Sequence, residues 1–231
     1  NVASARSPGD VYAYNLKSTR LTRWTNSSSP MLNPMDFVEP KLVRWKSFDG
    51  LMISGFLYQP DAKKFPGKRP VIVNIHGGPA SQARPGFINR SNYMVNELGV
   101  AFISPNVRGS SGFGKTFLAM DNGKKREDSV KDIGALLDFI PTRPALDPGR
   151  VGVIGGSYGG YMTVNALSRD SEYLFACGIA KYGDSNLVSS WAQCEKRLRV
   201  YTEIFLGHPS ANLQIYLKGS PITEAKNVQK P

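Results

Sequence analysis

The sequence predicts an α/β protein built on a mostly parallel central sheet. Apolar segments rich in β-branched residues alternate with segments of helical periodicity along most of the chain, and such alternation is typical of parallel sheets. A strong hairpin signal comes before this alternation and predicts antiparallel strands at one edge of the sheet. The 231 residues suffice for one large domain, or for one domain with a fragment of another.

Residues 1–28 are expected to stand apart from the rest of the chain. The stretch "GDVYAYNLKSTRLTRWT", residues 9–25, alternates around a polar turn and predicts two short strands. The Ser-, Asn- and Pro-rich "NSSSPMLNP" that follows is typical of a linker. A hairpin of this size is only marginally stable alone. We therefore interpret residues 1–28 as part of a larger β-domain N-terminal to this chain, and residues 29–231 as an incomplete α/β domain.

Each element of the α/β part follows from a local pattern. The segments "LVRWKSF" and "LMISGFLYQP" flank Asp49-Gly50, a dipeptide typical of hairpin turns. Four apolar runs predict buried strands, at residues 71–76, 100–106, 151–156 and 174–183. Segments with helical character lie between and after them, and we expect helices at residues 89–98, 127–140, 158–168 and 185–206.

The basic charge balance is scattered along the chain. Lysine and arginine number 29 against 18 acidic residues, a formal net charge of +11. The densest clusters, residues 124–126 and 196–199, lack the interleaved aromatic residues that single-strand binders use. We interpret both clusters as parts of a solvated basic face and expect no nucleic-acid partner. No apolar run reaches the length of roughly 18 residues that a membrane span needs, so no membrane partner is expected.

The cysteines and the N-terminus say little about chemistry or location. Cys177 and Cys194 fit neither a metal-binding spacing nor a disulfide framework, and no metal or organic cofactor is implied. Cys177 lies in an apolar run and is expected to be a buried, inert residue. The start "NVASARSPGD" has no initiator Met and no visible signal peptide. The sequence therefore leaves open a cytoplasmic, periplasmic or secreted location, and whether the protein forms homo-oligomers.

A serine between two pairs of glycines lies where a predicted strand becomes a predicted helix. In "VGVIGGSYGGYMTV", residues 151–164, the apolar run before Ser157 and the helical spacing after it place the glycines at a sharp turn. The motif Gly155-Gly156-Ser157-Tyr158-Gly159 matches the G-x-S-x-G nucleophile elbow of serine hydrolases. Glycine-rich turns also bind phosphates, but this one lacks the Lys-Ser/Thr ending of a P-loop.

A second motif supplies what acyl transfer through a serine also needs, which is a set of donors for the developing oxyanion. One donor in this architecture is the backbone N–H after the nucleophile, and another comes from a glycine-rich loop after an earlier strand. The segment "HGGPASQ", residues 76–82, directly follows the strand predicted at residues 71–76. Two such motifs in the right order are much more specific than either one alone.

Together these motifs make the chain resemble the catalytic domain of the prolyl oligopeptidase family of serine peptidases. The matching pieces are "HGGPASQ", "SPNVRGSSGFG", "DSVKDIGALLDF", "LDPGRVGVIGGSYGGYMT" and "KGSPI". The "HGGP" form is similar to the acylaminoacyl-peptidase and dipeptidyl-peptidase-like branch of that family. The resemblance implies an α/β-hydrolase fold, with residues 1–28 as the remnant of the last β-propeller blade and the linker.

The resemblance also implies roles for three residues and leaves the catalytic triad incomplete. Ser157 corresponds to the nucleophile, and the backbone amides of Gly78 and Tyr158 to the oxyanion hole. Arg108 matches the family too, either as a contact of the substrate or, as we prefer, as the partner of a scaffold carboxylate. The acid and the histidine of the family both fall beyond residue 231, so the C-terminal part of the hydrolase domain is expected to be missing.

The residues themselves offer only weak substitutes for the missing acid and base. The triad order in this fold is Ser, acid, His. After Ser157 the candidate acids are Asp170, at the wrong end of the sheet, and Asp184, at the correct end. His208 lies in a variable region and is expected at the surface, while His76 belongs to the oxyanion loop. We therefore expect no triad Asp or His in this chain, and no activity from the chain by itself.

The function predicted from the sequence is a serine peptidase that hydrolyses short peptides through an acyl-enzyme on Ser157. Two alternatives remain open. A carboxylesterase or thioesterase of the α/β-hydrolase fold shares the elbow and the oxyanion loop. A fragment without catalytic activity, with an unused serine, is the other. The P1 preference and the choice between exo- and endopeptidase action do not follow from the sequence.

Overall fold

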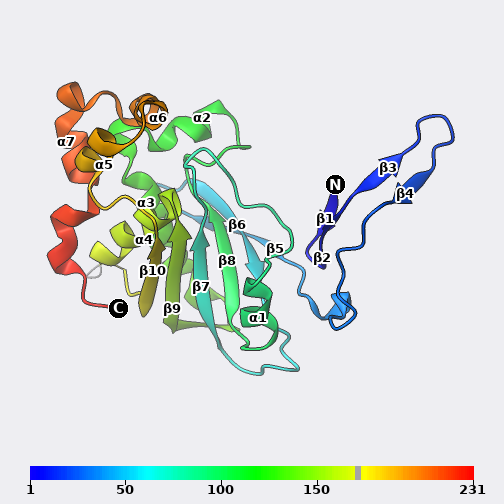
Figure 1. Ribbon diagram of the computed structural model, residues 1–231. Coiled ribbons are helices and arrows are strands. Elements are labelled where there is room, and N and C mark those ends of the chain that lie inside the picture. The colour runs from blue at the N-terminus through cyan, green and yellow to red at the C-terminus, as the bar shows by residue number, and fades with distance from the viewer. Residues whose placement is uncertain (170–172) are drawn as a thin grey trace.

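The centre of the molecule is a six-stranded mixed sheet with the strand order β10-β9-β7-β8-β6-β5 (Figure 1). The computed structural model describes residues 1–169 and 173–231. The four strands β7 to β10 run parallel, while β6 and β5 add antiparallel strands at one edge. The strands of this sheet are β5 (Lys41–Lys46), β6 (Met52–Tyr58), β7 (Arg69–Ile75), β8 (Ala101–Asn106), β9 (Leu146–Gly156) and β10 (Cys177–Lys181). The α/β fold with a mostly parallel sheet, expected from the sequence, is confirmed.

The middle of this sheet is buried, which explains why the sequences of its strands are continuous apolar runs. All six residues of β8 are buried, and on β7 the side chains of Val71, Val73 and Ile75 are at most 2% exposed. Strands covered on both faces read as continuous apolar runs, which is why these segments were recognisable. The hairpin of β5 and β6 turns at Asp49-Gly50, where Gly50 has a φ of +83°, as the dipeptide predicts.

The helices form the other layers of the domain. Helix α3 packs against β5 and α4, and α4 against β9 and β10, while α5, α6 and α7 gather beyond one end of the sheet (Figure 1). Helices α1, α3, α4, α5 and α6 confirm the helical segments predicted from the sequence, whereas α2 and α7 were not predicted. Their bounds are α1 (Ser91–Asn96), α2 (Lys115–Leu118), α3 (Asp128–Phe139), α4 (Tyr158–Ser168), α5 (Leu187–Gln193), α6 (Lys196–Leu206) and α7 (Pro209–Gly219).

The N-terminal residues form a thin β-arm that extends away from the sheet (Figure 1). It contains two antiparallel pairs, β1 (Val2–Ser4) with β2 (Ser7–Asp10) and β3 (Tyr12–Tyr14) with β4 (Leu21–Arg23). The second pair confirms the predicted hairpin. Asp10, the last residue of β2, connects the two pairs of the arm by accepting hydrogen bonds from Thr25 and Ser27, which follow β4. Although burial opposes the shift, these bonds and one from Arg23 lower the pKa of Asp10 to about 2.

The prediction that Cys177 is buried is wrong. Cys177 is exposed because β10 is the edge strand of the sheet and pairs with β9 only. Ile179, two residues further along the strand and on the same face, is 57% exposed. The apolar run therefore marked a strand correctly but did not reveal that its burial is incomplete.

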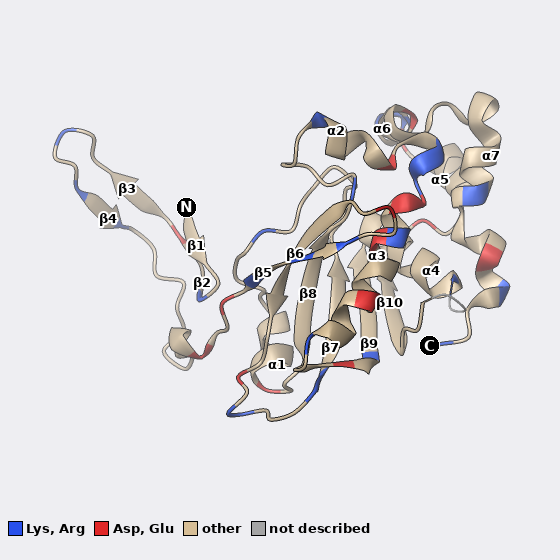
Figure 2. Ribbon diagram, turned by 180° about the vertical axis from the view of Figure 1, so that it is seen from behind, with Lys and Arg blue, Asp and Glu red and all other residues tan. Residues whose placement is uncertain are grey.

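Positions of lysine and arginine are spread over the arm, the loops and the helices (Figure 2). This distribution agrees with the scattered charge seen in the sequence. Among the described residues, no helix has both the length and the apolar character that crossing a bilayer requires.

Candidate active site

Ser157 occupies the turn between β9 and α4 in a strained backbone conformation. Its φ is +56° and its ψ −123°, values that a residue with a Cβ rarely adopts and that cost roughly 1–3 kcal/mol. The Ser157 amide donates to the Lys181 carbonyl at the end of β10, and its carbonyl accepts from the Tyr161 amide in α4. The side chain is exposed, and none of the described residues hydrogen-bonds its hydroxyl. The turn thus presents an unengaged hydroxyl at the carboxyl end of the parallel strands.

The glycines around Ser157 are required because backbone crosses backbone there. A Cβ at Gly155 would lie 2.2 Å from the Gly159 carbonyl oxygen, and one at Gly159 would lie 2.1 Å from the carbonyl oxygen of Ile75 in β7. A Cβ at Gly160 would lie 2.7 Å from the Lys181 oxygen. Real Cβ atoms do not approach so closely, so α4 can begin against β7 and β10 only with glycine at these positions.

The "HGGP" loop lies directly beside this turn. A Cβ at Gly77 would lie 3.5 Å from the Ser157 Cβ and 3.4 Å from the Gly156 carbonyl oxygen. Gly78 has a φ of +136°, which again favours glycine. Gly78, Ser157 and Tyr158 line one cavity, so the structure brings together the three residues that the sequence singled out. Both loops follow neighbouring parallel strands, β7 and β9, whose carboxyl ends meet at the same edge of the sheet.

His76 lies at the base of this loop with both ring nitrogens engaged. Nδ1 donates to the Gly77 carbonyl at 2.7 Å, so in the neutral ring Nε2 accepts from the Ser110 hydroxyl at 3.0 Å. Burial lowers the pKa of His76, partly opposed by the bond to Gly77. These contacts hold the loop in place.

The residues considered as acid or base are also engaged elsewhere. His208 is exposed, caps the N-terminus of α7 by accepting from the Ser210 amide, and packs its ring edge-on against Trp191. Asp184 follows β10 and lines the same cavity as Ser157, where its carboxylate accepts from Ser190 at 2.7 Å. Asp170 lies outside the described residues. No described histidine hydrogen-bonds Ser157.

The cavity beside Ser157 has a volume of about 330 Å³ and mainly aromatic and aliphatic walls. Tyr158 and Tyr161 from α4 stack with ring centroids 5.6 Å apart. Burial raises the pKa of Tyr158 to about 12, so its hydroxyl stays protonated at physiological pH. Helix α6 supplies most of the opposite wall through Leu198, Tyr201, Thr202, Phe205 and Leu206. Sequence analysis missed these α6 residues, although their spacing of three and four marks one helix face.

The prediction that residues 124–126 form a solvated basic face is wrong for Arg126. Its side chain is buried and lines the cavity of Ser157, while Lys124 and Lys125 are exposed. The Arg126 Nη1 donates to Asp121 Oδ2 at 2.6 Å, and the Tyr158 hydroxyl donates to the same oxygen at 3.1 Å. Its position directly after two lysines gave no signal, since only packing distinguishes it from them.

Arg108 lies in a buried network with two carboxylates, as the preferred alternative expected. It donates to Asp49 at 3.0 Å and to Asp132 at 2.9 Å, and its own amide also donates to Asp132. The Ser47 hydroxyl donates to Asp132 as well, at 2.5 Å. These contacts connect the β5–β6 hairpin to α3 and to the loop after β8. Arg108 therefore organises the scaffold beneath the site.

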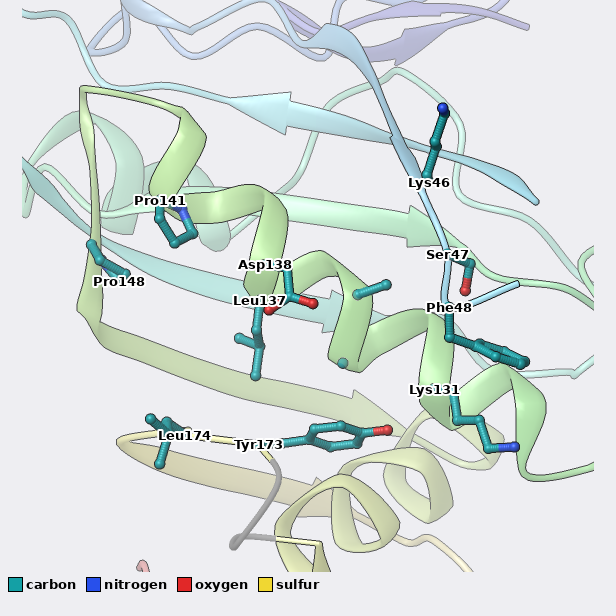
Figure 3. Close-up of a pocket in the computed structure, with 12 residues that line it drawn as sticks. Lys46, Ser47, Phe48, Lys131, Leu137, Asp138, Pro141, Pro148, Tyr173 and Leu174 are labelled. Atoms are coloured by element: carbon teal, nitrogen blue, oxygen red, sulfur yellow. The ribbon is translucent and has the colours of Figure 1, made fainter. Parts of the chain in front are cut away.

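A larger cavity, of about 570 Å³, runs along α3 between the β5–β6 hairpin and the segment before β10 (Figure 3). Its labelled side chains include Lys46, Phe48, Lys131, Asp138 and Tyr173. Among the described residues of its lining, the only serine is buried Ser47, whose hydroxyl donates to Asp132. Among the described residues, no group of three or more His, Cys, Asp or Glu is arranged to hold a metal ion.

Comparison with known proteins gives one consistent result. The sequence model described as "Prolyl oligopeptidase family" matches residues 86–231. Dipeptidyl aminopeptidase BIII of Pseudoxanthomonas mexicana is 29% identical over 99% of this chain. Acylaminoacyl peptidase of Pyrococcus horikoshii is 28% identical, with a TM-score of 0.83 over 99% of the chain. A crystal structure of puromycin hydrolase superimposes with a TM-score of 0.88 over 99% of the chain at 24% identity.

The chain spans about a third of the length of these proteins. It covers 34% of the dipeptidyl aminopeptidase, 36% of the acylaminoacyl peptidase chain and 35% of the puromycin hydrolase chain. The likeness therefore extends along nearly all of this chain but concerns only part of each relative.

Proposed function

The chain belongs to the prolyl oligopeptidase family of serine peptidases, and from this premise we propose that Ser157 is its nucleophile. In this proposal the protein hydrolyses short peptides through an acyl-enzyme. The observation that supports it most is the strained turn at Ser157, with φ of +56°, packed against the "HGGP" loop. A fold retains such strain where the site needs it.

The geometry supports a defined first step. The Ser157 Oγ attacks the carbonyl carbon of the scissile bond while its proton passes to a base. The amides of Gly78 and Tyr158, which line the same cavity, donate to the oxyanion as it develops. The tetrahedral intermediate then collapses. The amine leaves with the proton that the base took from Ser157, and the ester that remains on Ser157 is hydrolysed by water. Each amide donor contributes about 3 kcal/mol of transition-state stabilisation in comparable sites.

The base and the acid of this mechanism have no candidate among the described residues with suitable contacts. His76 and His208 both have other structural roles, and neither hydrogen-bonds Ser157. We infer that the triad Asp and His lie outside residues 1–231, and that residues 1–231 alone lack peptidase activity. A serine hydroxyl without a base is a weak nucleophile.

The substrate class and the role of the β-arm belong to the same proposal. Two relatives are named as a dipeptidyl aminopeptidase and an acylaminoacyl peptidase, so peptides with a free N-terminal dipeptide unit or an N-acylated amino acid are the substrates to test first. We propose that residues 1–28 end a β-propeller that limits access to short peptides. The exposed Leu21 and Trp24 of the arm support a further β-partner for it.

The experiment compares the full-length protein containing residues 1–231 with residues 1–231 alone. Both are assayed on aminoacyl, dipeptidyl and acetyl-aminoacyl p-nitroanilides and on p-nitrophenyl esters. We expect hydrolysis of amides by the full-length protein and none by the shorter chain. Ser157→Ala should lower the rate of the full-length protein by roughly 10³-fold or more. The rate that remains is the one that the oxyanion hole and substrate binding supply without the nucleophile.

Three results would count against the proposal. Hydrolysis of esters without any of amides favours the esterase alternative. Activity of the full-length Ser157→Ala variant equal to that of the parent excludes Ser157 as the nucleophile. Activity of residues 1–231 alone would show that base and acid lie within them, and would direct attention to His208 and Asp184.

A further inference from the structure

The cavity beside Ser157 contains a buried cation, Arg126, among aromatic, aliphatic and polar side chains that include the carboxylate of Asp184. Arg126 is only 5% exposed and lines this cavity together with Ser157, Tyr158 and Phe205. Its guanidinium carbon lies 5.3 Å from the Tyr158 ring centroid and 5.8 Å from that of Phe205. A guanidinium at this depth needs acceptors for its N–H groups, because an unpaired buried donor is costly.

The contacts of Arg126 fix the guanidinium in position. Asp121 accepts from Nη1 at 2.6 Å and also accepts from the Tyr158 hydroxyl at 3.1 Å. Tyr158 in turn is 3.0 Å from the Ser129 hydroxyl at the start of α3. The guanidinium is therefore held by a network of hydrogen bonds that includes Tyr158, the residue after Ser157. This network does not need to reorganise when a ligand binds.

The other buried arginine of this chain shows what a complete set of partners looks like. Arg108 is 4% exposed and donates to two carboxylates at once, those of Asp49 and Asp132. Arg126 is buried to the same extent but pairs with one carboxylate, Asp121, among the described residues. A guanidinium has five N–H donors in a fork that suits two carboxylates. Arg126 therefore has fewer acceptors than Arg108, and its side chain lines the cavity, where a ligand can supply another acceptor.

Resting on the proposed function, we propose that Arg126 is a specificity-determining residue that binds an acceptor oxygen on the substrate's P1 side chain. P1 is the residue whose carbonyl Ser157 attacks. The matching side chains are Glu and Gln: their methylene groups fit the aromatic walls, and their terminal oxygen accepts from the Arg126 fork. A lysine side chain brings like charge to Arg126 and is disfavoured. Norleucine has a similar length but no acceptor.

The test measures P1 preference in the full-length protein with acetyl-dipeptidyl p-nitroanilides that end in Glu, Gln, norleucine or Lys. We expect kcat/KM for Glu and Gln to exceed that for norleucine by about tenfold or more, as one hydrogen bond to a charged group supplies. In Arg126→Met/Asp121→Asn, which removes both partners and leaves no buried charge unpaired, this ratio should fall to about one.

Lys125→Met is the matched control, because Lys125 is exposed and does not line the cavity. It should keep the full preference for Glu and Gln. Arg126→Lys keeps the charge but loses the fork, so it should retain only part of the preference. Norleucine cleaved as well as Glu and Gln by the parent protein would overturn the proposal, and so would an unchanged ratio in the double variant.

A binding measurement separates this inference from the proposed nucleophile. Calorimetry with the dipeptides Ala-Gln and Ala-norleucine on the Ser157→Ala protein needs no turnover. Tighter binding of Ala-Gln that disappears in Arg126→Met/Asp121→Asn supports the role of Arg126 even if Ser157 proves not to be the nucleophile. Equal binding of the two dipeptides contradicts it, even if Ser157 is confirmed by the kinetic experiment.

Discussion

Two cavities of this protein, the α3 cavity and the cavity beside Ser157, differ more in the backbone conformation of the serine that lines them than in volume. The α3 cavity is the larger of the two, about 570 Å³ against about 330 Å³, but the serine among its described lining residues, Ser47, is buried and donates to a carboxylate (Figure 3). In the other cavity Ser157 is held at positive φ between crossing backbones, with an exposed hydroxyl. The comparison teaches that a reactive position is marked by forced backbone geometry and by free polar groups, whereas cavity volume alone does not mark it.

The largest expected difference concerns the two serines. Ser157→Ala should remove roughly 10³-fold or more of the full-length protein's kcat, since only the oxyanion hole and binding remain. Ser47→Ala should leave kcat/KM close to that of the parent and instead cost about 1.5–3 kcal/mol of unfolding free energy, because its hydroxyl bonds a buried carboxylate. Steady-state kinetics and urea unfolding measure the two effects. A stable but inactive Ser47→Ala variant would contradict this contrast.

The next contrast is between two glycines that face different neighbours. A Cβ at Gly159 would lie 2.1 Å from the backbone oxygen of Ile75, which cannot move without distorting β7. A Cβ at Gly134, in the α3 cavity, would lie 2.3 Å from the ring of Tyr173, which is buried but belongs to a side chain and not to the backbone of a strand. Gly159→Ala should therefore cost about 3 kcal/mol or more, and Gly134→Ala about 1 kcal/mol. Equal unfolding midpoints in urea for the two variants would refute the argument.

The "HGGP" loop beside Ser157 and the α3 cavity should also differ in their response to acid, because His76 lies at the base of that loop. Burial lowers the pKa of His76 from 6.5, so the folded state binds this proton more weakly than the unfolded state. The part of the unfolding free energy that depends on neutral His76 is fully present above pH 6.5. It is lost as the pH falls through 6.5 towards the pKa of His76 in the folded state. The melting temperature should decline over that interval, and His76→Gln should flatten the decline. No histidine lines the α3 cavity, so hydrogen exchange there should change less.

The smallest expected effect lies in the α3 cavity. Lys131 pairs with Asp128 at 2.9 Å and lies 4.7 Å from the Phe48 ring centroid, but it is largely open to solvent. Lys131→Met should change the unfolding free energy by less than about 1 kcal/mol, as is usual for exposed pairs. It should leave peptide hydrolysis unaffected. A marked loss of kcat/KM in this variant would mean that the α3 cavity communicates with the site, which the comparison denies.

What the sequence predicted depends on how local the cause was. The strand-to-helix turn at Ser157 and the helix after it follow from glycine spacing and apolar periodicity, and the structure places α4 at Tyr158–Ser168 as expected. The two antiparallel strands at the sheet edge followed from Asp49-Gly50. Each of these features is determined within about a dozen residues, and such features are readable from one sequence.

The rest depends on contacts between distant segments. Arg126 and Lys125 are neighbours of like charge, and only the packing of α4 and α6 around Arg126 makes one buried and the other exposed. Cys177 lies in an apolar run, but its exposure depends on which strands pair with β10. The contribution of α6 to the cavity wall follows from how that helix crosses the end of the sheet. No local pattern carries this information.

The most direct test of the central claim, that Ser157 is the nucleophile, is covalent labelling. The full-length protein is treated with a biotinylated fluorophosphonate, digested, and analysed by mass spectrometry. We predict a single modified peptide carrying the phosphonate on Ser157, no such adduct in Ser157→Ala, and full labelling in Ser47→Ala. An adduct on any other residue, or amide hydrolysis that persists after the phosphonate has modified Ser157 completely, would contradict the account.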